Sequence, residues 1–233
     1  MNKSSKSRTT ACTGAVAVLA LGAGCGGGHH LAEYPFASRT LAVVYIAPPA
    51  PELLTNYYDL TESRNPIQAV VRAGADVVKE REGRRASARL DSATARVNVQ
   101  AALAQRTLER ASRYLGTQAT TNQQQADYLM EVRMERFGIN AKGDNAAYLF
   151  TFAEAVLLDR RTGREIWNAN IHGRDRLTPY VQSTTGIPGS VITAGTLGSV
   201  SVADFQNALS QLMDLSSTLI TNELRSALRD VRN

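Results

Sequence analysis

The stretch DYLMEVRMERF, residues 127–137, together with AYLFTFAEAVLL, residues 147–158, decides the fold of this chain. In residues 127–137 apolar side chains alternate with charged ones, which is typical of a strand with one buried and one solvated face. Residues 147–158 are apolar on nearly both faces and favour a central strand. The turn-rich residues 138–147 predict a loop between the two strands. The sequence DRRTG, residues 159–163, predicts a tight hairpin with its glycine at positive φ.

A third strand is expected at residues 164–174. Trp167, Ala169 and Ile171 alternate there with polar residues, so they are expected to share one face. We therefore expect Trp167 to pack on the buried side of the sheet. The three strands together predict an antiparallel meander.

The flanking segments supply further elements. Residues 41–47 (LAVVYIA) form a short apolar run that prolines stop, and they predict a buried strand, whereas residues 52–65 predict a loop. Apolar residues at helical spacing predict a final helix at residues 201–229, which Ser201 opens with a Ser-x-x-Asp capping box. Residues 178–199 are rich in Gly, Ser and Thr and predict a long loop that is either mobile or a contact surface.

Residues 66–115 are expected to be helical. At about 100° per residue, the apolar side chains of residues 86–115 fall on one narrow stripe, whereas those of residues 66–82 fall on the opposite side. One straight helix cannot bury both stripes against one surface. We therefore expect two helices, at residues 66–82 and 86–115, with a break near Gly83; one long helix that serves two partners is the alternative.

These elements predict an α/β (α+β) fold, as a two-layer sandwich of a mixed, mainly antiparallel sheet with helices on one face. The expected domain organisation is a signal peptide at residues 1–24, a flexible tether at residues 25–38, and a single domain at residues 39–233. The domain would carry a long helical insertion at about residues 66–115.

The N-terminus has the layout of a secretory signal peptide, in which basic residues precede an uncharged stretch from residue 9 to residue 23. The run LGAGC, residues 21–25, resembles a bacterial lipobox, where the Cys thiol receives a diacylglycerol and the chain is cut before it. Cys25 is therefore expected to be a lipidation site that carries fatty acids such as palmitate. The alternative is an ordinary secreted protein with Cys25 as a free thiol. Lipoproteins that are retained in the inner membrane often have Asp directly after this Cys. Gly26 at that position implies that the protein is carried to the periplasmic side of the outer membrane.

Charge and cysteine content narrow the function further. Cys12 lies in the signal peptide, so the mature chain has one Cys and no internal disulfide. The formal net charge of +5 falls to +2 once the three basic residues of the signal peptide are removed. A global charge suited to nucleic acid is thus absent. No later stretch of about 18 apolar residues follows, so the lipid is the expected membrane anchor.

The sequence shows no catalytic constellation. Beyond the tether the only His is His172, and a Gly-x-Ser-x-Gly motif is absent. His29 and His30 have no further ligands nearby, so a metal site is not expected. Residues 178–199 lack the Gly-Lys-Ser/Thr of a phosphate loop. We expect no enzymatic activity and no cofactor, with an envelope hydrolase as the alternative from another class.

The best candidate for a binding surface is an arginine-rich helix face. Seven arginines fall opposite the apolar stripe of the predicted helix. Such a face is either plain solvated surface or a contact for anionic lipid, lipopolysaccharide phosphates or an acidic protein partner. The candidate binding residues are Arg81, Arg85, Arg89, Arg96, Arg106, Arg110 and Arg113.

The order of strand, helix, meander and closing helix behind a lipobox resembles two groups of bacterial lipoproteins. These are the auxiliary lipoproteins of ABC-type lipid-transport systems and the TolB-N-terminal-like periplasmic lipoproteins. The likeness lies in LAVVYIAPP (41–49), ADYLMEVRMERFGI (126–139), AEAVLLDRRTGREIW (153–167) and FQNALSQLMDLSSTLITNEL (205–224). It implies a non-enzymatic, lipid-anchored accessory subunit of a trans-envelope transport or assembly system. A regulatory activator of a peptidoglycan synthase is the alternative.

Overall fold

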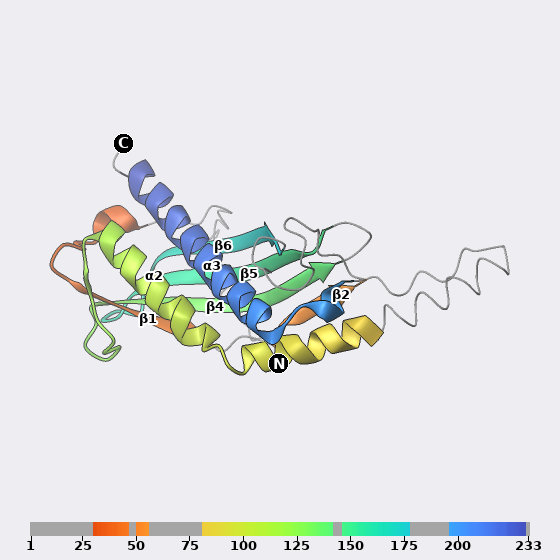
Figure 1. Cartoon of the computed structure of the whole chain (residues 1–233). Helices are drawn as coiled ribbons and strands as arrows, with labels where there is room; N and C mark the ends of the chain where they lie inside the picture. The colour runs from red at the N-terminus through yellow and green to blue at the C-terminus, as the bar shows by residue number, and fades with distance from the viewer. Residues whose placement is uncertain (1–29, 47–49, 56–80, 142–145, 178–195, 232–233) are drawn as a thin grey trace, which may run out of the picture.

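The computed structural model describes residues 30–46, 50–55, 81–141, 146–177 and 196–231. Their strands form a six-stranded mixed sheet in the order β3-β1-β4-β5-β6, with β2 paired to the far part of β4. The helices lie on one face of this sheet (Figure 1). The predicted fold class, a two-layer mixed sheet with helices on one face, is confirmed. The strands are β1 (Thr40–Ile46), β2 (Glu52–Thr55), β3 (Gln118–Ala119), β4 (Tyr128–Ala141), β5 (Tyr148–Asp159) and β6 (Glu165–Arg176).

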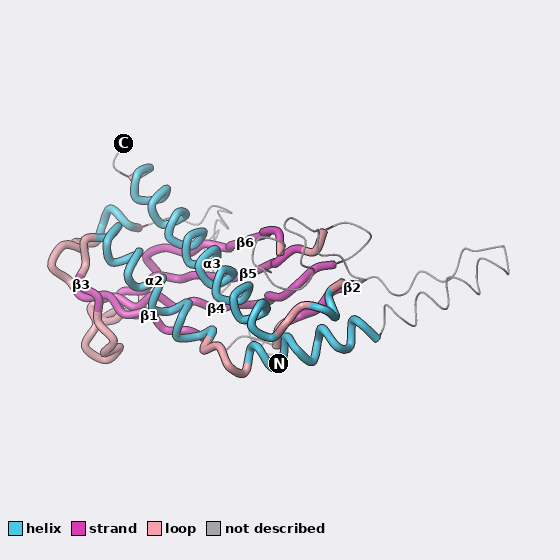
Figure 2. Tube along the Cα trace, viewed as in Figure 1, coloured by secondary structure: helices cyan, strands magenta, loops and turns pink. Residues whose placement is uncertain are grey.

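The predicted meander is present as β4, β5 and β6, which pair antiparallel in sequence order. β1 runs parallel to β4, and this pairing makes the sheet mixed. β5 lies between β4 and β6, as its apolar sequence predicts. Figure 2 shows the strands side by side behind α2 and α3.

Two strand boundaries differ from the prediction at one place in the sheet. β4 continues through Gly138 to Ala141, where a loop was expected, and residues 52–55 form β2 rather than loop. Gly138 explains both differences. Its φ is 151°, and a Cβ at this position would lie 1.9 Å from the carbonyl oxygen of Glu52. The missing side chain lets β2 approach β4, so this glycine extends the sheet instead of ending it.

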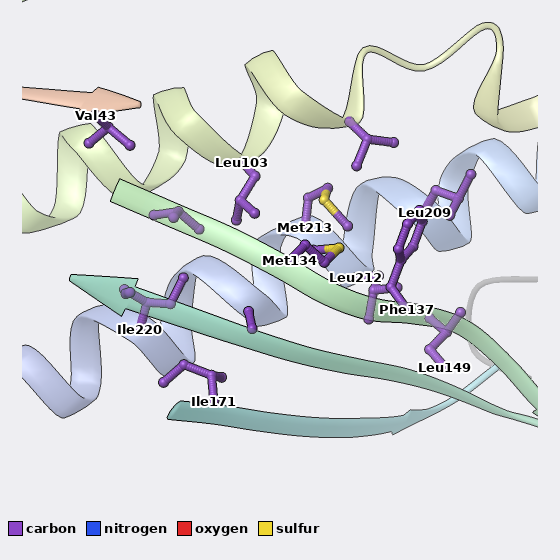
Figure 3. Close-up of a cluster of buried hydrophobic side chains, with 14 of the residues drawn as sticks. Val43, Leu103, Met134, Phe137, Leu149, Ile171, Leu209, Leu212, Met213 and Ile220 are labelled. Atoms are coloured by element: carbon purple, nitrogen blue, oxygen red, sulfur yellow. The ribbon is translucent and has the colours of Figure 1, made fainter. Parts of the chain in front are cut away.

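Trp167 lies in the core, as the alternation of β6 predicts. Its exposed fraction is 2%, equal to that of Ile171, whereas Asn170 and His172 are exposed on the other face. A register shift at Leu157 lets Ile166 be buried as well. Figure 3 shows the centre of this core, where side chains of β4, β5 and the final helix point toward one another; among them are Met134, Phe137, Leu149, Leu209, Leu212 and Met213.

The final helix, α3 (Val202–Asp230), agrees with its predicted bounds. The hydroxyl oxygen of Ser201 accepts a hydrogen bond from the Asp204 backbone N–H at 3.1 Å and donates to the Asp204 carboxylate at 2.6 Å. The predicted N-terminal cap is thus confirmed. A 3-10 turn, η3 (Leu197–Ser199), precedes α3. Within the described ranges, no helix has the length and apolar character needed to cross a bilayer.

The predicted helix at residues 86–115 is wrong in its boundaries. Residues 81–94 are helical, residues 95–98 form a turn, and α2 (Val99–Leu115) begins anew. The Asn98 side chain accepts from the Ala101 N–H at 2.9 Å and caps α2. Gly83 lies buried inside helix 81–94 and does not break it. Most of the predicted helix at residues 66–82 lies outside the described residues.

The break changes which side of α2 is buried. Val99, Leu103 and Thr107 are buried, whereas Ala101 is exposed and Leu108 is half-buried. The buried stripe is therefore rotated toward the arginines compared with the prediction. A continuous helix carries one phase along its length, and the turn at residues 95–98 resets that phase.

The predicted flexible tether extends too far along the chain. A 3-10 turn, η1 (Leu31–Glu33), belongs to the fold, and Leu31 and Phe36 are buried. The His30 backbone N–H donates to the Ile166 carbonyl at 2.9 Å. Residues 30–38, which were expected to be tether, therefore already belong to the fold.

Candidate functional site

Three of the seven candidate arginines lie between the helices and not on an open face. Arg89 donates to the carbonyl oxygens of Gly198 and, at 3.0 Å, of Val200, just before α3. Arg106 donates to the Ser210 carbonyl and, at 2.9 Å, to the Ser210 hydroxyl. These arginines hold the helical layer together.

Arg110 makes the densest set of these contacts. Its guanidinium donates to the Asp214 carboxylate at 2.8 Å, to the Asp214 carbonyl at 3.1 Å and to the Thr218 hydroxyl at 2.9 Å. Ser210, Asp214 and Thr218 are spaced four residues apart and form a polar stripe on α3. Arg106 and Arg110 have the same spacing on α2, so the two stripes match.

The other four arginines are exposed. Arg81 and Arg85 lie on helix 81–94, and Arg96 lies in the turn that follows. Arg85 pairs with Glu82 at 2.7 Å. Arg113 lies in the last turn of α2. The seven arginines therefore do not form one continuous face, because the turn at residues 95–98 divides them and α3 covers the middle of the set.

The sheet face away from the helices carries an aromatic and arginine cluster that the sequence analysis missed. Arg136 forms a fork with Glu52, with N–O distances of 2.8 and 2.6 Å, and its guanidinium carbon lies 5.8 Å from the Phe152 ring centre. This hydrogen-bonded pairing lowers the pKa of the Glu52 carboxyl and raises the pKa of Arg136. Arg174 lies 3.7 Å over the Tyr148 ring. Sheet register brings these residues together, and it could not be read from any one strand.

A cavity of about 460 Å³ lies at the end of the sheet where β1 and β4 begin and the β5–β6 hairpin turns. Asp127 is a charged residue of its lining with several hydrogen bonds. The Asp127 carboxylate accepts from the backbone N–H and the hydroxyl of Thr40, both at 2.8 Å, and it pairs with Arg39 at 3.3 Å. These hydrogen bonds, the backbone one above all, hold the pKa of Asp127 below its ordinary value.

The other carboxylates at this end of the sheet are hydrogen-bonded, whereas two of its exposed arginine side chains have no such partner among the described residues. Glu33 bonds to His30 at 2.8 Å and to Arg164 at 3.2 Å, and its pKa is lowered mainly by the His30 contact. Asp159 is 9% exposed, and its carboxylate accepts from the Arg161 backbone N–H at 2.9 Å. The side chains of Arg160 and Arg161 are exposed, and within the described residues neither makes a hydrogen bond or an ion pair. We define Arg39, Arg160, Arg161 and Arg164 as the hairpin-end arginines.

The other positions singled out in the sequence add no candidate site among the described residues. Cys25, His29 and residues 178–195 lie outside the described residues. His172 is exposed, and its ring lies 4.9 Å from that of Phe152. Among the residues that the structure describes, no group of three His, Cys, Asp or Glu side chains gathers as a metal site would require.

No model of a known protein family matches the sequence, and no curated protein matches it. Among solved structures, XCC0632 from Xanthomonas campestris shares 21% identity over 44% of this chain, with a TM-score of 0.26. The chain spans about half of that protein, 51% of its length. A candidate lipoprotein from Caulobacter crescentus shares 16% identity over 55% of this chain and 83% of its own, with a TM-score of 0.29. The lipoprotein GNA1162 from Neisseria meningitidis shares 17% identity over 65% of this chain and 91% of its own, with a TM-score of 0.24.

Proposed function

We propose that this chain is a lipid-anchored envelope protein that acts by binding, as an accessory subunit of a trans-envelope transport or assembly system. One observation carries the proposal: LGAGC at residues 21–25 ends five residues before His30, whose backbone is bonded to β6. A domain this close to an acylated Cys works next to the bilayer. Gly26 favours the periplasmic leaflet of the outer membrane. Membership of one of the two lipoprotein groups that the sequence resembles is part of the proposal.

Three exposed arginines, on helix 81–94 and in the turn after it, are the proposed contact for an acidic partner. Arg81, Arg85 and Arg96 extend from helix 81–94 and its following turn, and Glu82 is the one acid that pairs with any of them in the described residues. Arg-rich surfaces bind carboxylates and phosphates through forked hydrogen bonds. Non-enzymatic action remains part of the proposal, because the sequence offers no nucleophile and base at a recognisable spacing.

The anchor is tested by replacing Cys25 with Ser and labelling cells with a clickable fatty acid. The Cys25→Ser protein should lack the label and should no longer be found in the membrane fraction. The Cys12→Ser protein, which changes the other Cys of the chain, should keep the label and stay in the membrane fraction. Label on the Cys25→Ser protein would refute lipidation at this residue.

The accessory role is tested by affinity capture of the lipidated protein from crosslinked cells. A defined envelope protein should copurify with the wild type and should be lost from a variant with Arg81, Arg85 and Arg96 changed to Glu. Turnover of a cell-wall or lipid ester by the purified protein would instead support the hydrolase alternative.

A further inference from the structure

The position of His30 limits which end of the molecule can face the bilayer. Leu31 is 3% exposed, and the backbone of His30 is bonded to β6, so the chain is held in place from residue 30 on. Five peptide steps separate Cys25 from His30, and a fully extended chain spans at most about 18 Å over that length. If Cys25 is acylated, as the proposed function states, the end of the sheet that carries η1 stays within that distance of the membrane.

That end carries the hairpin-end arginines. The β5–β6 hairpin places Arg160 and Arg161 at its apex, and the Asp159 carboxylate bonds to the backbone of the same turn. Arg39 precedes β1 at the same end, where β1 meets the start of β4.

Within the part of the chain that the structure describes, the acids of this end already have hydrogen-bond partners, and the side chains of Arg160 and Arg161 have none. Asp127 accepts from Thr40 and Arg39, and Glu33 is bonded to His30 and Arg164. Among the described residues, the charges of this end are therefore four arginines and four carboxylates, namely Arg39, Arg160, Arg161, Arg164, Glu33, Asp127, Asp159 and Glu165, the last of which accepts from the Asn168 side chain. The guanidinium groups of Arg160 and Arg161 are the ones left for an external anion.

We propose that Arg160 and Arg161 bind the phosphate groups of anionic lipid headgroups in the bilayer that holds the acylated Cys25. An arginine near an anionic leaflet gains about fivefold in binding, and two in one turn gain on the order of 25-fold. This docking would orient the domain as well as hold it. β1 and β4 both begin at this end, so they run away from the membrane.

The orientation separates the two arginine surfaces. β4 has 14 residues and spans about 45 Å at about 3.3 Å per residue. Helix 81–94 lies near the β2 end of the sheet, away from η1 (Figure 1). Arg81 and Arg85 would then face away from the bilayer, where a protein partner can reach them.

The test uses the acylated, processed protein in vesicles. The mature chain has no Cys besides Cys25, whose thiol is blocked in the acylated protein. Thr162→Cys therefore places one fluorescent label at the hairpin apex. In vesicles with 30% phosphatidylglycerol, lipids with a nitroxide on the headgroup should quench this label. The quenching gives the equilibrium constant between docked and undocked hairpin, and the double change Arg160→Gln with Arg161→Gln should weaken it about 25-fold. Neutral phosphatidylcholine vesicles or 0.5 M salt should weaken it similarly. A label at Ala50→Cys, beside β2, should stay unquenched throughout.

Two outcomes separate this inference from the function on which it rests. Protein that does not stay on vesicles at all refutes the lipid anchor. Protein that stays on vesicles, but whose hairpin label responds neither to lipid charge nor to the double Gln change, refutes the docking of Arg160 and Arg161. The sheet-face pair Arg133→Gln with Arg174→Gln is the matched charge control and should dock like wild type.

Discussion

Arg110 of α2 binds Asp214 of α3 through two contacts at once, because one guanidinium nitrogen lies 2.8 Å from the carboxylate and another 3.1 Å from the main-chain carbonyl. The second of these nitrogens also donates to Thr218 at 2.9 Å. The Arg110 side chain is 29% exposed, so its hydrogen bonds are partly shielded from water. An arginine that the sequence places on a solvated face is thus part of the packing between the two long helices.

Arg110→Ala should therefore destabilise the protein. The change removes three hydrogen bonds, and bonds to charged groups contribute more than neutral ones, so we expect a loss of about 2 kcal/mol in the free energy of unfolding. Urea unfolding followed by circular dichroism measures it. Arg113→Ala, one turn away and exposed, should change stability by less than about 0.5 kcal/mol. Equal effects of the two changes would contradict the assigned packing role of Arg110.

Trp167→Ala should unfold or severely destabilise the domain. Trp167 is 2% exposed and lies on the helix-covered face of β6. Removing a large core side chain costs about 3–5 kcal/mol, a large share of the stability of a typical domain. Thermal melting measures the loss, with Asn170→Ala on the opposite face as the control. An unchanged melting curve for the Trp167 variant would show that the register of β6 is wrong.

Gly138→Ala should cost more than the same change at another glycine with positive φ. The new Cβ would meet the Glu52 carbonyl oxygen at 1.9 Å, so β2 must move away from β4. Overpacking and backbone strain together predict a loss of about 2–4 kcal/mol. At Gly163, φ is 69° and the space is open, so Gly163→Ala should cost only about 1 kcal/mol. Similar costs at both positions would argue against the close β2–β4 approach.

The Asp127 carboxylate should contribute to the pH dependence of stability. Its pKa is lowered by the Thr40 hydrogen bonds, so its contribution is complete above the ordinary pKa of 3.8 and is lost as the pH falls through the folded-state pKa. Asp127→Asn should melt below wild type at pH 7, by a difference that shrinks below about pH 3.8. Melting curves from pH 7 to pH 2.5 measure this. A difference that grew on acidification would contradict the sign.

Reversing the charge of Arg81, Arg85 and Arg96 should weaken partner binding without affecting the fold. Arg81, Arg85 and Arg96 are exposed, so their change to Glu should alter the melting temperature little. Each charge that contacts an acidic partner typically contributes to a salt-sensitive association rate. Arg133, Arg174 and Arg176, exposed on β4 and β6, provide the matched triple control. If the variant with Arg81, Arg85 and Arg96 changed to Glu captured the partner at wild-type yield, these arginines would be plain solvated surface.

The local sequence pattern determined most of the sheet. Alternation in β4 and β6 placed Trp167 and Met134 on the buried face, and the Asp159–Gly163 turn fixed the hairpin between β5 and β6, because a period of two assigns sides without any tertiary information. The Ser201 cap of α3 was equally local. The N-terminal motif around Cys25 predicted the anchor in the same way, from consecutive residues.

The tertiary structure decided which polar groups meet. Helical phase placed Arg106 and Arg110 opposite the core, but phase is reset by the turn at residues 95–98, and nothing in α2 itself shows that Ser210 and Asp214 of α3 lie against them. Likewise, Arg39 and Asp127 are 88 residues apart, and only the parallel pairing of β1 with β4 brings them together. Local pattern assigns a residue to a face, whereas the partner on that face comes from chain topology, which here brings together segments 88 and 104 residues apart.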